Sequence, residues 1–178
     1  MHKDIKTVLV SETEIIKRCR ELGEQITKDY EGKNPILIGL LKGSVPFMAE
    51  IMKYINLDLE LDFMDVSSYS GTESQGDVRI DKDVSNSIKG DDIILVEDIV
   101  DTGRTLKTVV ELLYSKGAKS VKIVSLLDKP DRRVVEIEAD YVGFTVPNEF
   151  VVGYGLDFNQ KYRNLPYVGI LKEECYKE

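Results

Sequence analysis

The sequence is poor in histidine and cysteine. Its only histidine is His2, which disfavours any mechanism that needs a histidine base or a transition metal held by histidines. The two cysteines, Cys19 and Cys175, lie near opposite ends of the chain without the spacing of a metal site or a redox motif. This pattern predicts a reducing compartment and no disulfide framework. Cys19 falls on the apolar positions of a predicted helix, so we expect it to pack in the core.

Long apolar runs are also missing. No run approaches the roughly 20 residues that cross a bilayer, and the first residues do not form a signal-peptide core. We therefore expect a cytoplasmic protein that binds no membrane. The composition, 42% hydrophobic and 31% charged, is that of a globular protein. A length of 178 residues suits one sizeable core, which predicts a single domain over residues 1–178.

Positive charge is in deficit. The sequence has 24 lysines and arginines and 32 acidic residues, which gives a net charge of −8. This charge disfavours a large nucleic-acid-binding surface. A compact anionic ligand would need a local basic pocket, helped by Mg²⁺. The candidates for that pocket are Lys42, Arg104, Lys129 and Arg163.

Predicted strands and helices alternate along the chain. Ser11–Glu14 has the pattern of a capping box that opens a helix to about Tyr30. Short, continuously apolar runs predict buried strands over 35–41, 92–96 and 121–127, and helices are expected over 45–55 and 104–116. This alternation predicts an α/β fold with a parallel sheet flanked by helices, and with ligands at the carboxyl ends of the strands.

The remaining segments are less regular. Residues 57–66 alternate between apolar residues and acids, which favours a half-exposed strand at the sheet edge or at a subunit contact. Residues 67–76 are small and polar, which predicts a mobile loop before a strand near 78–80. Beyond Lys129 we expect short strands over 141–145 and 151–154 and an irregular tail.

The most informative segment is 93–106, where an apolar strand runs into Glu97 and Asp98 and then into a small-residue turn that opens a helix. Backbone N–H groups of the turn, with the hydroxyls of Thr102 and Thr105, can bind a phosphate at the positive end of the helix dipole. The two acids suit ribose hydroxyls or Mg²⁺. The spacings of a P-loop and of a dinucleotide fingerprint are both absent from this segment. A plain connection ending in a helix cap is the alternative, but such a short connection rarely carries this many polar groups without a ligand.

This segment resembles the signature of the phosphoribosyltransferases that bind 5-phosphoribosyl-1-pyrophosphate. In order and spacing, four further segments resemble the short bacterial form of the hypoxanthine-guanine phosphoribosyltransferases, and the resemblance covers nearly the whole chain. These segments are 41–44 (LKGS), 67–72 (SSYSGT), 127–130 (LDKP) and 150–157 (FVVGYGLD) followed by 162–164 (YRN). The resemblance implies the type I phosphoribosyltransferase fold with a small hood and a mobile loop. It also implies transfer of the phosphoribosyl group to hypoxanthine or guanine, giving IMP or GMP and pyrophosphate.

The resemblance assigns roles to individual residues at the sugar-phosphate end. Asp101 matches the general base and acid at purine N7. Glu97 and Asp98 match the ribose-binding acids with an associated Mg²⁺, and Asp157 matches a second metal contact. The 5-phosphate loop would comprise Asp101, Thr102, Gly103, Arg104 and Thr105, with Arg104 taking part through its backbone.

Pyrophosphate and purine contacts follow in the same way. Lys42 and Gly43 match the pyrophosphate loop, with a non-proline cis peptide between Leu41 and Lys42, and Arg163 matches the other pyrophosphate contact. Lys129 matches the donor to the 6-oxygen of the purine, which disfavours adenine. The other purine contacts would be Phe150, Val151 and Asp157, and the mobile loop would contain Ser68 and Tyr69.

Members of this family form homodimers or homotetramers, so we expect one of these states, with a 6-oxopurine and phosphoribosyl pyrophosphate as small-molecule partners and no nucleic acid. Three alternatives remain open at this point. A xanthine-preferring sister transferase would share the same motifs. A nucleic-acid-binding regulator of the same fold would sense the sugar donor, but the acidic composition disfavours it. A structural domain would leave the charged residues at the strand ends unexplained.

Overall fold

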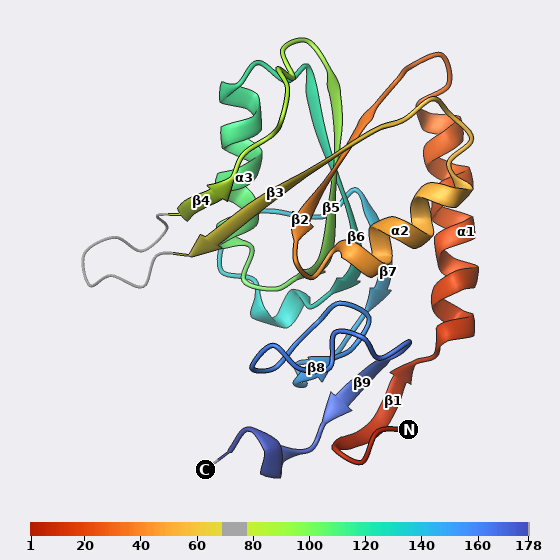
Figure 1. Ribbon diagram of the computed structural model, residues 1–178, viewed down its shortest axis with the longest axis vertical. Helices are drawn as coiled ribbons and strands as arrows, with labels where there is room; N and C mark the ends of the chain where they lie inside the picture. The colour runs from red at the N-terminus through yellow and green to blue at the C-terminus, as the bar shows by residue number, and fades with distance from the viewer. Residues whose placement is uncertain (69–77, 178) are drawn as a thin grey trace.

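The computed structural model describes residues 1–68 and 78–177 (Figure 1). Most of the predicted mobile loop, including Tyr69, lies outside the described residues. The helices are α1 (Glu12–Asp29), α2 (Val45–Ile51) and α3 (Arg104–Ser115), with 3₁₀ turns η1 (Met52–Tyr54), η2 (Pro130–Arg132) and η3 (Glu173–Cys175). The strands are β1 (Ile5–Val10), β2 (Ile36–Leu41), β3 (Glu60–Ser68), β4 (Val78–Lys82), β5 (Asp92–Val100), β6 (Ser120–Asp128), β7 (Tyr141–Thr145), β8 (Val151–Val152) and β9 (Val168–Leu171).

A six-stranded sheet in the order β4-β3-β2-β5-β6-β7 forms the centre of the molecule. All its neighbours pair in parallel except β3 and β4, which are antiparallel. Successive side chains of β5 enter opposite faces. Ile94 and Val96 pack with α1 and α2, whereas Ile93 and Leu95 pack with α3. Two-sided burial explains the continuous apolar runs, and the predicted parallel sheet flanked by helices is confirmed.

Helix α1 begins as its sequence predicts. The Ser11 Oγ accepts a 3.2 Å hydrogen bond from the Glu14 N–H, and the Glu14 carboxylate accepts a 2.8 Å bond from the Ser11 N–H. The capping box is therefore confirmed. Helix α2 is shorter than expected, because regular helix ends at Ile51 and a 3₁₀ turn continues to Tyr54.

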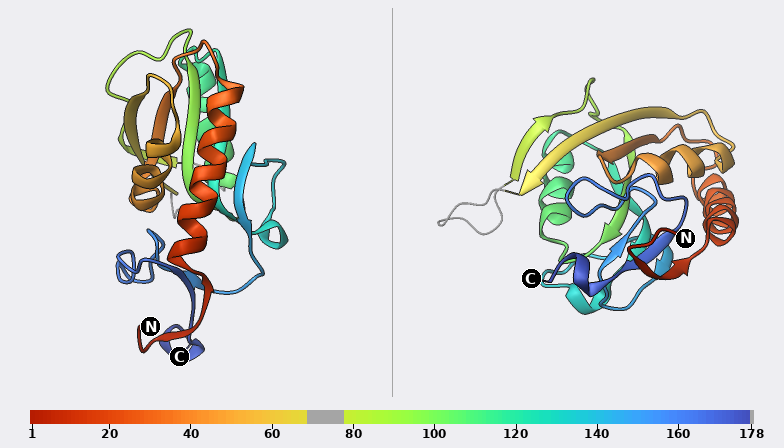
Figure 2. Two further views of the ribbon diagram at one scale, coloured as in Figure 1. Left: turned by 90° about the vertical axis from the view of Figure 1, so that its right-hand side faces the viewer. Right: turned by 60° about the horizontal axis from the view of Figure 1, so that its bottom comes forward.

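A small antiparallel sheet, β1-β9-β8, lies beyond the carboxyl ends of the parallel strands (Figure 2). We call this sheet the hood. It joins the two ends of the described chain, since β1 pairs with β9 along its length. The expected irregular tail thus contains a regular strand, β9, whose four residues are all buried. The hood faces the carboxyl ends of the parallel strands, and these strand ends therefore lie between the two sheets.

Of the two positions expected for residues 57–66, the sheet edge is wrong, and the subunit contact stays a prediction. Strand β3 lies between β2 and β4, and β4 forms the edge. The expected half-exposure is confirmed, with Leu61 46% exposed and Met64 fully buried. The apolar Leu61 is thus exposed, whereas the acid Asp62 on the opposite face of β3 is held by hydrogen bonds.

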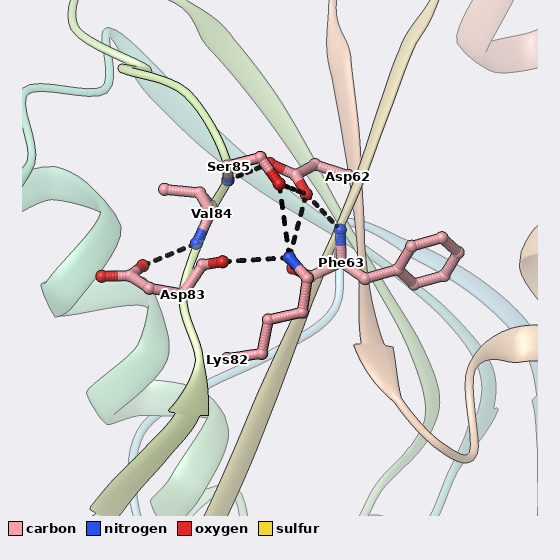
Figure 3. Close-up of polar contacts among 6 residues, drawn as sticks. All are labelled: Asp62, Phe63, Lys82, Asp83, Val84 and Ser85. Atoms are coloured by element: carbon pink, nitrogen blue, oxygen red, sulfur yellow. Dashed lines mark hydrogen bonds and ion pairs between the residues drawn. The ribbon is translucent and has the colours of Figure 1, made fainter.

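A polar network fastens the connection between β4 and β5 to β3 (Figure 3). The Asp62 carboxylate accepts hydrogen bonds from the N–H groups of Ser85 (2.7 Å) and Phe63 (2.8 Å). The Lys82 ammonium donates to the carbonyl oxygens of Phe63 (2.8 Å) and Asp83 (3.0 Å). These contacts hold the segment that leads into β5, the strand that carries the candidate site.

Candidate active site

Strand β5 extends further than its apolar run suggested, to Val100 rather than Val96. Glu97 and Asp98 therefore lie within its carboxyl end, held by pairing with β6. The Glu97 carboxylate accepts a 3.0 Å hydrogen bond from the Asp98 N–H, and the Asp98 carboxylate accepts a 2.7 Å bond from the Ile99 N–H. Burial and the neighbouring Asp98 charge raise the pKa of Glu97, and burial raises the pKa of Asp98. Two adjacent, partly buried carboxylates favour a cation or a set of hydroxyl donors between them.

The turn from Asp101 to Thr105 leads from β5 into α3. Gly103 is the N-cap with φ of 85°, and a Cβ atom there would lie 2.4 Å from the Cγ2 atom of Ile137. Both the left-handed backbone and the close approach require glycine. Asp101 is thus not the helix cap, and its carboxylate instead lies 3.2 Å from the Nε of Arg132. Gly103 offers no side-chain cap, so the first N–H groups of α3 are open to a ligand, with Thr102 and Thr105 beside them.

Arg133, a residue that the sequence did not single out, stabilises this turn through hydrogen bonds to its backbone. Its guanidinium donates to the carbonyl oxygens of Val100 (3.0 Å), Asp101 (2.6 Å) and Ile137 (2.9 Å) and pairs with the Asp128 carboxylate. The ends of β5 and β6 and the loop after η2 are thereby tied together. The side chain of Arg104, in contrast, is exposed.

The segment after β2 lies directly against the acids of β5. The expected cis peptide between Leu41 and Lys42 is present. A Cβ atom on Gly43 would lie 1.8 Å from the Asp98 Oδ2, and one on Gly155 would lie 1.9 Å from the Gly43 carbonyl oxygen. Three segments distant in sequence therefore meet at Gly43 with no room for a side chain.

Two cations converge next to this contact. The Lys42 Nζ (3.4 Å) and the Arg163 Nη2 (3.3 Å) both lie within hydrogen-bonding distance of the same oxygen of Gln160. Arg163 also donates to the Gly155 carbonyl oxygen (2.7 Å) and pairs with Asp157 at 3.2 Å. A single neutral oxygen shared by two cations marks a place where an anion is favoured. The sequence carried no signal for Gln160.

Among residues 1–68 and 78–177, Lys129 is the one charged residue that is buried, with 8% of its surface exposed. Its N–H donates to the Val100 carbonyl oxygen (2.9 Å), and its Nζ donates to the Glu149 carbonyl oxygen (2.8 Å). Burial lowers the pKa of Lys129, and the charge of Asp101 opposes that effect. Lys129 thus connects the end of β6 with the segment that enters the hood.

The remaining predicted site residues belong to the hood or to β3. Phe150 is partly buried among aromatic rings, and the adjacent Val151 is buried in β8, paired with Ile170. Ser68 is exposed at the end of β3, where it pairs with Val78. Apart from Ser68 and the undescribed Tyr69, the predicted residues gather where the parallel strands meet the hood.

The acids fit a shared Mg²⁺ better than a closed metal cage. Within residues 1–68 and 78–177, no group of three or more His, Cys, Asp or Glu side chains could hold a metal ion. Asp157 is engaged by Arg163 and by the Gln160 N–H at 2.8 Å. Glu97 and Asp98 nevertheless supply hard oxygen donors, which Mg²⁺ commonly combines with water and substrate phosphates.

None of the helices in the described part of the chain is long and apolar enough to span a membrane.

An α/β fold that places an acid pair, a phosphate-binding turn and paired cations at the carboxyl ends of parallel strands defines a class of sugar-phosphate-binding proteins. The family model for the phosphoribosyl transferase domain matches residues 8–159. The chain belongs to the phosphoribosyltransferase family.

Curated relatives of this chain include proteins named for one particular phosphoribosyltransferase activity. The chain is 61% identical to a hypoxanthine-guanine phosphoribosyltransferase of Lactococcus lactis, covering all of this chain and 97% of the relative. It is 58% identical to the protein of that name in Streptococcus pyogenes, of which it covers 99%. It is also 59% identical to the bifunctional protein TilS/HprT of Listeria monocytogenes, but it spans only 28% of that longer chain.

Solved structures of phosphoribosyltransferases are similar to this chain in fold. A hypoxanthine phosphoribosyltransferase from Staphylococcus aureus superposes with a TM-score of 0.96 at 55% identity, covering 100% of this chain and 97% of the other. A Trypanosoma cruzi hypoxanthine phosphoribosyl transferase gives a TM-score of 0.94 at 37% identity, with 99% and 96% covered. The type I phosphoribosyltransferase fold expected from the sequence is confirmed.

Proposed function

We propose that this protein is a purine-salvage phosphoribosyltransferase that converts hypoxanthine or guanine and phosphoribosyl pyrophosphate to IMP or GMP and pyrophosphate. The contact between Gly43 and Asp98 carries the proposal. It joins the loop assigned to pyrophosphate with the acids assigned to ribose. The groups that would bind the pyrophosphate of the sugar donor therefore lie in contact with the groups that would bind its ribose.

The donor would lie along the edge where β2 and β5 end. Glu97 and Asp98 would accept hydrogen bonds from the ribose hydroxyls, and the N–H groups of residues 102–105 would bind the 5-phosphate. Lys42 and Arg163 would stabilise the negative charge that develops on the departing pyrophosphate. Their shared contact with Gln160 supports this assignment, because it places both cations near one oxygen.

The purine would bind between the ends of β5 and β6 and the hood. Asp101 would take the proton from N7 during synthesis and return it in the reverse direction. Lys129 would donate to the 6-oxygen, and its buried ammonium supports a preference against the amino group of adenine. Phe150 would stack on the base, and the backbone at Val151 with Asp157 would contact its far edge. Ser68 and Tyr69 would belong to the loop that excludes water.

Mg²⁺ is part of this proposal. Glu97 and Asp98 would hold it directly or through water, with Asp157 on the pyrophosphate side. Bound Mg²⁺ would supply positive charge that neutralises pyrophosphate oxygens. The adjacent carboxylates support a cation here, because burial raises the pKa of both acids and a nearby positive charge would stabilise their charged forms.

We further propose that residues 1–178 form one catalytic domain that works in the cytoplasm. The pairing of β1 with β9 supports a single unit, and the two free thiols, Cys19 and Cys175, suit a reducing compartment.

Self-association as a dimer or tetramer would use the apolar stripe of Val45, Ala49 and Met52, three exposed residues at helical spacing. Light scattering on the wild type and on Met52→Glu tests this, and an unchanged mass for the variant counts against that surface.

Pyrophosphate release tests the proposed reaction. The assay contains Mg²⁺ and phosphoribosyl pyrophosphate, with hypoxanthine, guanine, xanthine or adenine in separate reactions. We expect turnover with 6-oxopurines and none with adenine, and the rates rank hypoxanthine, guanine and xanthine. Donor binding without turnover on any base would instead indicate a regulator of the same fold.

A further inference from the structure

The ring of Phe150 is held by two other aromatic rings. Tyr176 stacks on one of its faces, with a centroid distance of 4.7 Å and an interplanar angle of 23°. Phe158 meets it edge-on, at 5.5 Å and 89°. Both arrangements are favoured aromatic geometries. The protein itself therefore covers one face of Phe150 with Tyr176 and packs Phe158 against the same ring at a right angle.

The turn that carries Tyr176 is anchored to the hood. The N–H of Lys172 donates to the Asp4 carbonyl oxygen (2.9 Å), and the N–H of Tyr176 donates to the Glu173 carbonyl oxygen (3.1 Å). Tyr176 packs with Phe150 against a small buried cluster made of Ile5, Val152 and Leu171. Tyr176 thus has a defined position beside Phe150 although it belongs to the last turn of the chain.

Lys129 and Tyr176 contact the segment 149–150 from different parts of the fold. Lys129 comes from the end of β6 in the parallel sheet and donates to the Glu149 carbonyl oxygen at 2.8 Å. The turn with Tyr176 follows β9, and the C-terminus lies at the end of the molecule away from the six-stranded sheet (Figures 1 and 2). Under the proposed function, the base would stack on the face of Phe150 opposite Tyr176.

We propose that Tyr176 is a positioning residue for the purine, acting through Phe150. Its ring holds the ring of Phe150 in one orientation, so that the opposite face of Phe150 is ready to stack on the base. This inference rests on the proposed function, since that function assigns the base to Phe150. A ring that is already fixed loses little conformational freedom on binding, which improves affinity for the base without any direct contact.

The proposal predicts which kinetic constant responds. Tyr176→Ala removes the supporting ring and should raise KM for hypoxanthine by about three- to tenfold, the range that one aromatic pair contributes. KM for phosphoribosyl pyrophosphate and kcat should stay within about twofold, because the substitution touches neither the donor site nor Asp101. Tyr176→Phe keeps the ring and should restore the wild-type KM for hypoxanthine.

The matched control is Glu174→Ala, an exposed residue of the same turn that should leave all three constants unchanged. Thermal melting of each variant separates loss of folding from loss of base affinity. If Tyr176→Ala lowers KM for hypoxanthine, Tyr176 obstructs the base and the proposal is overturned. Equal increases in both KM values, an unchanged KM for hypoxanthine, or failure of Tyr176→Phe to rescue also overturn it.

The same experiment distinguishes this inference from the proposed function. A wild-type protein that turns over no purine refutes the proposed function, and with it the assignment of the base to Phe150. A wild-type protein that turns over 6-oxopurines, with a Tyr176→Ala variant of unchanged kinetics, refutes only the role of Tyr176.

Discussion

The Oδ2 atom of Asp98 lies 1.8 Å from the position that a Cβ atom on Gly43 would occupy. The Asp98 carboxylate cannot easily move away, because its other oxygen accepts a 2.7 Å hydrogen bond from the Ile99 N–H. On the other side, the Gly43 carbonyl oxygen lies against Gly155. The requirement for glycine at position 43 therefore comes from the close approach of three segments.

Gly43→Ala tests this contact. The added methyl group must displace Asp98 or the loop, and a misplacement of about 1 Å at an active site can cost about 10²-fold in rate. We expect a loss of this order in kcat/KM for phosphoribosyl pyrophosphate, measured by steady-state kinetics. Gly90→Ala is the control, because Gly90 has φ of 82° with nothing near its added Cβ atom, so only stability should fall. Similar kinetic losses in both variants would contradict the argument.

Asp101→Asn tests the assignment of the proton transfer. Asparagine keeps the shape of the side chain but cannot accept the purine proton, so we expect kcat to fall by about 10²- to 10⁴-fold. Binding of phosphoribosyl pyrophosphate, measured by calorimetry, should change little. Asp131→Asn, at an exposed position in the neighbouring turn η2, should keep wild-type turnover. Near wild-type kcat in Asp101→Asn would remove Asp101 from this role.

Lys129→Ala tests recognition of the 6-oxygen. Losing a charged donor typically costs about 1.5–3 kcal/mol, so kcat/KM for hypoxanthine and guanine should fall by about ten- to a hundredfold. Discrimination against adenine should weaken by a similar factor. The melting temperature should fall too, because the Glu149 carbonyl oxygen loses its 2.8 Å donor. Lys107→Ala, on the exposed face of α3, is the control. An unchanged base profile would place Lys129 outside the purine site.

The sequence predicted the central sheet well because its strands are buried on both faces. Continuous apolar runs such as 36–41 have few alternatives in a soluble protein, and the capping box of α1 is a local signal. The end of β5 was placed too early, because Glu97 and Asp98 interrupt the apolar run although the strand continues to Val100. Pairing with β6 extends the strand through those polar residues, and such pairing is not visible in a local pattern.

The pairing of the hood strands and the contacts of two site residues show a second limit, although the family resemblance did imply a small hood. Strands β1 and β9 are short and stabilise each other although they lie at opposite ends of the chain. Arg133 acts through backbone carbonyl oxygens, and Gln160 accepts from two cations that are brought together only by the fold. The family resemblance supplied the charged residues that we predict to contact a ligand. It did not supply the residues that position them.

Asp62→Asn tests the network that fastens the β4–β5 connection (Figure 3). Burial acts to raise the pKa of Asp62, but hydrogen bonds from the N–H groups of Ser85 and Phe63 and the charge of Lys82 outweigh it and lower the pKa below the ordinary 3.8. The charged form therefore stabilises the fold fully above pH 3.8, and this stabilisation is lost as the pH falls through the folded-state value.

Asparagine keeps one acceptor but lacks the charge, so we expect Asp62→Asn to lower the free energy of unfolding by about 1–2 kcal/mol at neutral pH. Urea denaturation of both proteins from about pH 7 down to about pH 3 should show that difference shrinking in the acid range. Asp58→Asn, at an exposed position before β3, should cost little at any pH. A difference that stays constant across the whole pH range would mean that packing or hydrogen-bond geometry, rather than the charge of Asp62, stabilises this connection.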